Sequence, residues 1–410
     1  MDHLSEFDDI RPYEDHEIPA AVQRLIRDPE MANLLLQLRY PGPSRWFGAV
    51  LRPLVRWRMQ KALGHIRTVR EFQLLVGVHM EKLLAEHGSV LSVSGLEQLP
   101  SDQAHLFMSN HRDIAMDPAL VDLVLDRHGH KTVRIAIGDN LLSKPFVSDL
   151  MRINKSFIVK RSVQGRREKL QALTLLSRYI RHSVTADREP VWIAQREGRA
   201  KDGRDRTETA LLKMLTLSKA RGEEFGAALA SLNIVPVAIS YELDPCDVLK
   251  ARELHALRTT GEYRKSQYED IESIYRGIFG NKGRIHVAFG TPLGAACASD
   301  DLAAAEIDRQ IATLYRLQVS NLVAWREQGG DMAVFERFCD EPACSAAEWA
   351  ARERVFLERL TQCPSECRDL FLAMYANPVQ TRLDFEGREP LGGVIASPAV
   401  PTGDAESVEP

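Results

Sequence analysis

The chain has 410 residues, of which 44% are hydrophobic and 27% charged, and these are the proportions of an ordinary folded globular protein. A net charge of -4 at pH 7 argues against general nucleic-acid binding, so no nucleic-acid partner is expected. The acidic N-terminus lacks the apolar core of a signal peptide, and no apolar run approaches the ~18 residues that span a bilayer. We therefore expect a cytoplasmic protein whose contact with a membrane is peripheral.

The first part of the chain, from Glu17 to Glu86, has helical periodicity with breaks at Pro41–Pro43 and Gly64. Within it, the segment Arg45–Met59 combines aromatic residues at i, i+4 spacing with arginines that suit anionic headgroups. This pattern fits a helix on a membrane surface and equally an amphipathic helix that covers a sheet. Pro53 is expected to interrupt any single helix here.

Seven short β-type runs then alternate with helical stretches. The runs are Val90–Val93, Ala104–Met108, Thr132–Ile137, Ser156–Val159, Val191–Ala194, Ile234–Tyr241 and Arg284–Phe289. The helical patterns between them are Leu120–Arg127, Arg167–Arg181 and Thr207–Lys219, and those after them are Asp301–Glu327, Met332–Cys339 and Ala346–Leu360. The alternation predicts an α/β fold, in which helices pack on the faces of a sheet.

A histidine and two carboxylates follow the second run and form the first candidate site. His111 is either a structural histidine or a general base, and Asp117 is either a plain helix cap or the acid that orients this base. The pair Asp117-Pro118 is typical of a helix start, with Asp as the cap and Pro at the first helical position. Residues six apart on one helix point to different sides, so His111 meets Asp117 only if a turn separates them. Asp113 is the competing acid, within reach of a tight turn.

Two further blocks carry cations at the ends of strands. Lys160 and Arg161 follow the fourth run and precede a helix, and both features favour an anion. The turn Glu197-Gly198-Arg199 follows the fifth run. Gly198 lets the backbone approach a ligand, Arg199 can make a two-pronged contact with phosphate, and Glu197 can accept from a hydroxyl or hold a cation. Each block alone is also consistent with a solvated basic loop.

Four motifs in this order resemble the glycerolipid acyltransferase superfamily, in particular its glycerol-3-phosphate acyltransferase branch. They are His111 with Asp117, Phe157–Arg161, Glu197–Arg199 and Val235–Val237. The later run Asn281–Leu293 resembles the strand and Gly-x-Pro turn that close that domain. Two departures stand out: five residues rather than the family's four separate His111 from Asp117, and the third motif lacks the residue that usually separates Gly from Arg.

The resemblance implies a mixed sheet flanked by helices, with helical additions at both ends of the chain. It also divides the chain into four regions. They are a helical region at 1–89 with a membrane-surface contact, an acyltransferase core at 90–295, a helical region at 296–388 and a tail at 389–410. The tail contains Pro, Gly, Ser and acidic residues but almost no large apolar ones, and we expect it to be disordered.

The function implied by the resemblance is transfer of a fatty acyl group from acyl-CoA or acyl-ACP to a hydroxyl of glycerol 3-phosphate or 1-acylglycerol 3-phosphate (lysophosphatidate). This reaction serves phospholipid biosynthesis on the inner face of the membrane. His111 would remove the proton of the acceptor hydroxyl, Asp117 or Asp113 would orient it, and the two cationic blocks would bind the acceptor phosphate.

No cofactor is expected beyond the thioester co-substrate, and no metal, because the six cysteines follow no zinc-ligand spacing. Two alternatives stay open. One is acyl transfer to a non-glycerol acceptor, for which the phosphate-binding cations would be dispensable. The other is a lipid-binding protein that keeps the fold while its catalytic site has drifted.

Overall fold

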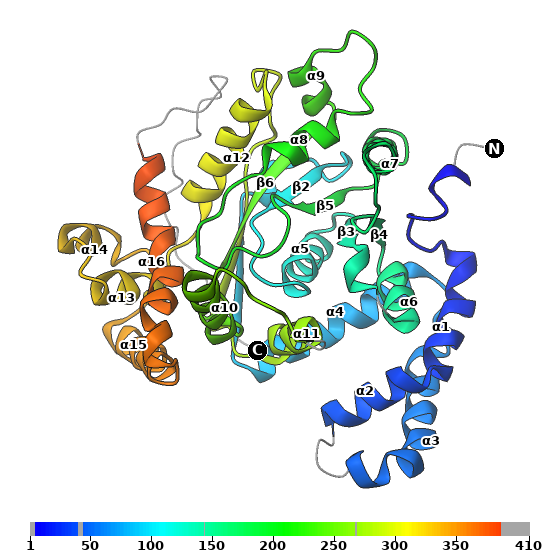
Figure 1. The fold of residues 1–410 in the computed structure, drawn as a ribbon, viewed down its shortest axis with the longest axis horizontal. Helices are drawn as coiled ribbons and strands as arrows, with labels where there is room; N and C mark the ends of the chain where they lie inside the picture. The colour runs from blue at the N-terminus through cyan, green and yellow to red at the C-terminus, as the bar shows by residue number, and fades with distance from the viewer. Residues whose placement is uncertain (1–4, 40–43, 143, 267–268, 387–410) are drawn as a thin grey trace, which may run out of the picture.

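The computed structural model describes residues 5–39, 44–142, 144–266 and 269–386, and among these the side chains of all but residues 5, 37–39 and 44–50. The expected break at Pro41–Pro43 and the expected disordered tail at 389–410 lie outside the described residues. At the centre of the structure is a seven-stranded sheet with helices on both faces (Figure 1). The expected α/β fold with a mixed sheet and helical additions at both ends is therefore confirmed.

The sheet contains all seven predicted strands, with ends that differ from the predicted ones by two residues at most. They are β1 Val90–Ser94, β2 Leu106–Ser109, β3 Arg134–Gly138, β4 Ser156–Val159, β5 Val191–Ala194, β6 Ile234–Tyr241 and β7 Arg284–Phe289. Their spatial order is β1-β7-β6-β2-β5-β3-β4. Among the strands of the described chain, only the β6–β7 pair is antiparallel, so β6, β2, β5, β3 and β4 all run in one direction. The carboxyl ends of these five strands consequently meet at a single edge.

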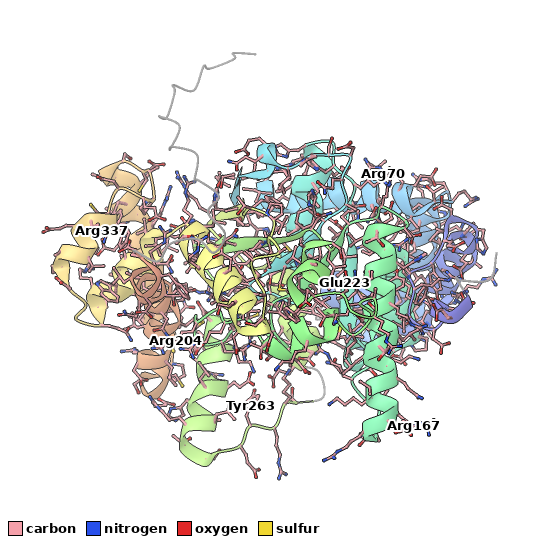
Figure 2. The ribbon with its side chains drawn as sticks, turned by 90° about the horizontal axis from the view of Figure 1, so that it is seen from above. Arg70, Arg167, Arg204, Glu223, Tyr263 and Arg337 are labelled. Carbon is pink, nitrogen blue, oxygen red and sulfur yellow. The ribbon has the colours of Figure 1, made fainter. Side chains whose placement is uncertain are left out.

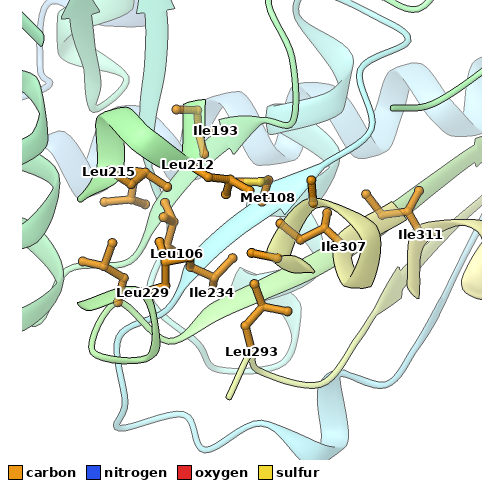
Figure 3. Packing of buried hydrophobic residues seen from close by; sticks show 14 of the residues in the cluster. Leu106, Met108, Ile193, Leu212, Leu215, Leu229, Ile234, Leu293, Ile307 and Ile311 are labelled. Atoms are coloured by element: carbon orange, nitrogen blue, oxygen red, sulfur yellow. The ribbon is translucent and has the colours of Figure 1, made fainter. Parts of the chain in front are cut away.

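Both faces of the sheet are buried under helices, which explains why its strands are apolar throughout. Successive residues of β2 alternate between the faces: Leu106 and Met108 join the cluster in Figure 3, and Phe107 joins the opposite one. The cluster in Figure 3 lies under α7 Arg166–Thr185, α8 Thr209–Leu215, α9 Phe225–Ala230 and α12 Asp300–Leu314. The opposite face is covered by α4 Val69–Glu86 and α5 Met116–Arg127.

The N-terminal region is helical. Its first three helices are α1 Ile18–Arg27, α2 Pro29–Arg39 and α3 Ser44–Leu63, and the predicted break at Gly64 separates α3 from α4. Pro53 lies inside α3, so the expected interruption there is wrong. A proline removes one backbone hydrogen bond, and the turns on either side of it keep theirs. Helix α1 packs on α6 Pro145–Ile153, and no helix in the described parts of the chain is long and apolar enough to cross a bilayer.

Up to residue 386, where the described part of the chain ends, four α-helices follow α12. They are α13 Val319–Glu327, α14 Met332–Phe338, α15 Ala346–Thr361 and α16 Arg368–Phe385. The expected continuous helix Asp301–Glu327 is wrong: α12 ends at Leu314 and α13 begins at Val319, where the Asn321 side chain accepts the backbone N–H of Gln318 at 2.8 Å. Helix α12 packs on the sheet itself through Ile307 and Ile311 (Figure 3). The boundaries of the four predicted regions stay predictions.

Candidate active site

The three candidate blocks lie at the edge where the five parallel strands end. His111 follows β2, the turn Glu197–Arg199 follows the neighbouring β5, and Lys160 with Arg161 follows β4. The guanidinium of Arg161 lies 3.2 Å from the carboxylate of Glu197, so the second and third blocks meet. Helix α7 begins at this edge, and Figure 2 shows its Arg167 projecting on the same side of the molecule as Tyr263.

The first block forms a turn around the carboxylate of Asp117. The Nδ1 atom of His111 lies 2.8 Å from Oδ2 of Asp117, and the Asp117 side chain is fully buried. The same Oδ2 accepts the backbone N–H groups of Arg112 and Asp113 at 2.7 and 2.9 Å. The hydroxyl of Tyr241, at the end of β6, donates to Oδ1 at 2.7 Å. The turn thus brings together two side chains that one continuous helix would separate.

Asp113 has a different role in this turn. Its Oδ1 accepts the N–H groups of Ala115 and Met116, each at 3.0 Å, and among the described side chains it makes no hydrogen bond with His111. Helix α5 begins at Met116, so the expected Asp117 cap with Pro118 at the first helical position is wrong. The carboxylate of Asp117 turns back to the loop instead, and Asp113 accepts the amides that open the helix. Burial and the nearby charge of Asp117 raise the pKa of Asp113.

The imidazole of His111 is held on two sides and is 13% exposed. The ring of Trp192, from β5, lies edge-on to it with 5.9 Å between the centroids, and the Trp192 indole N–H donates to Ser109 at 3.0 Å. With Nδ1–H donating to Asp117, the lone pair lies on Nε2, which has no hydrogen-bond partner among the described residues. A fixed tautomer with a free Nε2 is the arrangement that a general base needs.

Buried polar contacts join the first block to the loop after the third. The Arg112 guanidinium donates to the carboxylate of Asp205 at 2.6 Å and to the carbonyl of Gly203 at 3.1 Å. The backbone N–H of Ala200 donates to the carbonyl of His111 at 2.8 Å. The two loops are therefore packed as one unit at the sheet edge.

Two further helices, absent from the sequence prediction, close the site from the side of α5. They are α10 Asp247–Thr260 and α11 Glu269–Phe279. Lys250 of α10 is almost fully buried and donates to the carbonyl of Arg112 at 2.7 Å. Helix α11 approaches Asp113 at Gly277, where an added Cβ atom would lie 2.2 Å from the carboxylate. Both helices thus hold the turn that contains His111.

The predicted cations diverge at this edge. Arg161 is exposed and meets Glu197, whereas Lys160 lies 3.3 Å from Asp9 in the N-terminal segment. Arg199 is half-buried and lies 3.4 Å from the Ser273 hydroxyl of α11. Neighbouring residues of extended chain point to opposite sides, which explains why Lys160 and Arg161 find different partners.

Gly198 has a φ of +74°, in the left-handed region that favours glycine, and is exposed. On either side of this turn, Glu197 contacts Arg161 and Arg199 contacts Ser273. The structure therefore brings Arg161 and Glu197 together, while Arg199 faces α11.

Sequence reasoning missed three side chains of the site: Arg112, Lys250 and Tyr241. The alternation along β6 could have found Tyr241, because Val235, Val237 and Ile239 share its face of the sheet. Nothing in the sequence distinguishes Lys250 from a solvated helix lysine. Arg112 and its partner Asp205 are 93 residues apart, so their pairing depends on the arrangement of the strands.

No group of three or more His, Cys, Asp or Glu side chains is arranged to hold a metal ion within the part of the chain that the structure describes. A cavity of about 500 Å³ lies at the opposite edge of the sheet. Two of the residues that line it, Thr132 and Lys155, lie just before β3 and β4. None of the predicted site residues lines it.

Comparison with known proteins bears on the same stretch of chain. Residues 90–240, which include all three candidate blocks, match the acyltransferase family model. No curated protein matches the sequence. A structural search finds the 1-acyl-sn-glycerophosphate (LPA) acyltransferase PlsC from Thermotoga maritima, with 14% identity over 69% of this chain and 95% of that chain and a TM-score of 0.35. Residues 90–240 thus match the acyltransferase family, which agrees with the resemblance found in the sequence and supports acyl transfer as the activity of this region.

Proposed function

We propose that the protein transfers a fatty acyl group from acyl-CoA or acyl-ACP to a hydroxyl of glycerol 3-phosphate or 1-acylglycerol 3-phosphate, in phospholipid biosynthesis. The observation that carries the proposal is the buried contact of 2.8 Å between His111 and Asp117 at the carboxyl edge of an acyltransferase domain. A buried acid paired with a partly exposed imidazole suits deprotonation of an alcohol.

In this reaction, Nε2 of His111 accepts the proton of the acceptor hydroxyl as the oxygen attacks the carbonyl carbon of the thioester. The resulting tetrahedral intermediate breaks its C–S bond, and the imidazolium returns the proton to the leaving thiolate. Asp117 stays ionised, holds the tautomer through Nδ1 and stabilises the imidazolium. The acyl group moves directly between the substrates, so no side-chain nucleophile is required.

The acceptor phosphate is proposed to bind between the ends of β5 and β4. The pair Arg161–Glu197 is exposed to solvent, where an ion pair contributes little, so a phosphate can replace Glu197 at low cost. Arg199 follows β5 from the other side of Gly198 and supplies a second guanidinium. Lys160 can bind the same phosphate only if its ion pair with Asp9 breaks. The Asp9 side chain is largely exposed to solvent.

Contact with an anionic lipid surface is proposed for α3. Trp57 and Leu54 of this helix are 60% and 46% exposed, and Arg58 and Lys61 are exposed beside them. The Lys61 ammonium lies 5.8 Å from the centre of the Trp57 ring. An aromatic side chain flanked by cations suits the headgroup layer of an acidic membrane, such as the inner face of the plasma membrane.

The direct test uses purified protein, labelled acyl-CoA and acyl-ACP, and a panel of phosphorylated and unphosphorylated alcohols. We expect ester formation with the phosphorylated acceptors, and a loss of roughly 10²–10⁴-fold in kcat for His111→Ala because the general base is removed. His79→Ala, at an exposed histidine of α4, is the matched control and should keep parent activity. A parent protein that acylates none of the acceptors refutes the proposal, and a His111→Ala rate within a few-fold of the parent excludes this base.

The two acids of the turn permit a paired comparison. Asp117→Asn should lower kcat by roughly 10²-fold or more, because an amide has one acceptor oxygen and cannot stabilise the imidazolium. Asp113→Asn should have a smaller effect, since Asp113 accepts the two amides at the start of α5 and makes no hydrogen bond with His111 among the described side chains. Steady-state rates at constant folded fraction, checked by thermal unfolding, decide the ranking. The reverse order would make Asp113 the orienting acid.

Removal of Arg161 or Arg199 should weaken binding of the acceptor and leave binding of the acyl donor unchanged. A charge-assisted contact contributes about 1.5–3 kcal/mol, so Arg161→Ala and Arg199→Ala should each raise the acceptor KM roughly 10–100-fold. Arg337→Ala, at an exposed arginine of α14 distant from this edge in Figure 2, controls for the loss of one positive charge. If KM rises for the thioester instead, the cations bind the donor.

Vesicle co-sedimentation tests the membrane contact. Binding to vesicles that contain an acidic phospholipid should fall roughly 3–10-fold in Trp57→Ala, because the aromatic ring no longer enters the headgroup layer. Val355→Ala, which shortens an exposed apolar side chain of α15, is the control. Equal binding of the parent and Trp57→Ala would contradict the proposed role of α3.

A further inference from the structure

The two oxygens of the Asp117 carboxylate have different partners. Oδ2 accepts three N–H groups, from His111 Nδ1 and from the backbone of Arg112 and Asp113. Oδ1 accepts only from the hydroxyl of Tyr241, at 2.7 Å, among the residues that the structure describes. A buried carboxylate oxygen without a donor is costly, so this hydroxyl completes the hydrogen bonding of the acid.

The position of Tyr241 is set by the sheet. All eight residues of β6 are buried, and Tyr241 is the last of them. Its side chain shares one face with Val235, Val237 and Ile239, which is the face that α5 covers. A phenol at the end of an apolar strand needs a buried partner for its hydroxyl, and Asp117 of α5 is that partner.

Other charged groups surround Tyr241 and Asp117, and each of them has hydrogen-bond partners of its own. Lys250 pairs with Asp244, and the Lys282 ammonium donates to the carbonyls of Ile278 and Gly280. Asp113 accepts the first amides of α5. Burial and the charges of Asp117 and Asp113 raise the pKa of Tyr241 well above its ordinary value, so the phenol stays a donor.

We propose that Tyr241 is a positioning residue that acts on His111 through Asp117. Its hydroxyl holds the orientation of the carboxylate and withdraws negative charge from it, and thereby sets how strongly Oδ2 stabilises the imidazolium. The catalytic part of this inference rests on the function proposed above, whereas the coupling of Tyr241 to His111 does not.

Tyr241→Phe removes the hydroxyl and keeps the ring. Without this donor the carboxylate accepts more strongly from the imidazolium, so the midpoint of the His111 titration should move to higher pH by roughly 0.3–1 unit. NMR of the imidazole ring protons, assigned by their loss in His111→Ala, measures this midpoint. The acidic limb of the kcat/KM profile should move in the same direction. The carboxylate also loses the hydroxyl that fixes its orientation toward His111, so kcat should fall roughly 3–30-fold with little change in acceptor KM.

Site-specific 3-fluorotyrosine at position 241 provides a second, opposite change. It keeps the shape of the side chain but is a stronger hydrogen-bond donor, so the midpoint should move to lower pH. Tyr13→Phe is the matched control, because the Tyr13 hydroxyl also donates to a carboxylate, that of Asp149, over 2.7 Å. That bond joins the N-terminal region to α6, and its loss should leave the His111 titration unchanged.

Opposite shifts for phenylalanine and fluorotyrosine support the coupling, since a purely structural role cannot produce both signs. Equal midpoints in the parent and both variants overturn it, as does a loss of thermal stability with no shift. The titration requires no turnover. An inactive parent with shifting midpoints would therefore refute the acyltransferase proposal alone, and an active parent with unmoved midpoints would refute the coupling alone.

Discussion

The buried carboxylate of Asp117 is the interaction on which the site depends. An unpaired charge without exposure to water would be strongly destabilising, and here four donors from the turn and from β6 satisfy it. The two backbone donors fix the turn between His111 and α5, and the bond to Nδ1 fixes the tautomer of the imidazole. The bond from Tyr241 fixes the end of β6 beside α5. The imidazole of His111 is consequently held against the packed interior, and among the described residues its Nε2 has no hydrogen-bond partner.

The cationic side of the site has the opposite character. Arg161 and Glu197 are exposed, and Lys160 pairs with an exposed acid of the N-terminal segment. Ion pairs in water are weak, so these side chains can exchange partners when an anionic substrate arrives. The edge of the sheet thus combines a rigidly held histidine with cations that can change partners. The proposed acylation of a phosphorylated alcohol requires both. The contacts of Ala200 with His111 and of Arg112 with Asp205 keep the two parts in register.

The local pattern of apolar and polar residues was sufficient to predict the strands of the sheet, but it gave wrong positions for several helix ends. Seven apolar runs bounded by polar turns became seven strands, because burial on both faces leaves a strong signal over four to eight residues. Pro53 and the Asp117-Pro118 pair gave wrong helix ends. In the second case the carboxylate of Asp117 turns back to the His111 loop, where the imidazole and two backbone N–H groups donate to it.

The sequence by itself determined the strands, the order of the His, Lys-Arg and Glu-Gly-Arg blocks, and the match of residues 90–240 to the acyltransferase family. Each of these is a property of neighbouring residues, whose spacing and polarity are read directly along the chain. Only the tertiary structure decided that Asp117 rather than Asp113 contacts His111, that Tyr241 and Lys250 support the turn, and that Lys160 faces away from Arg161. These choices join residues of separate elements, Tyr241 and Asp117 being 124 positions apart, and depend on strand order and on which partner can be buried without loss of a hydrogen bond.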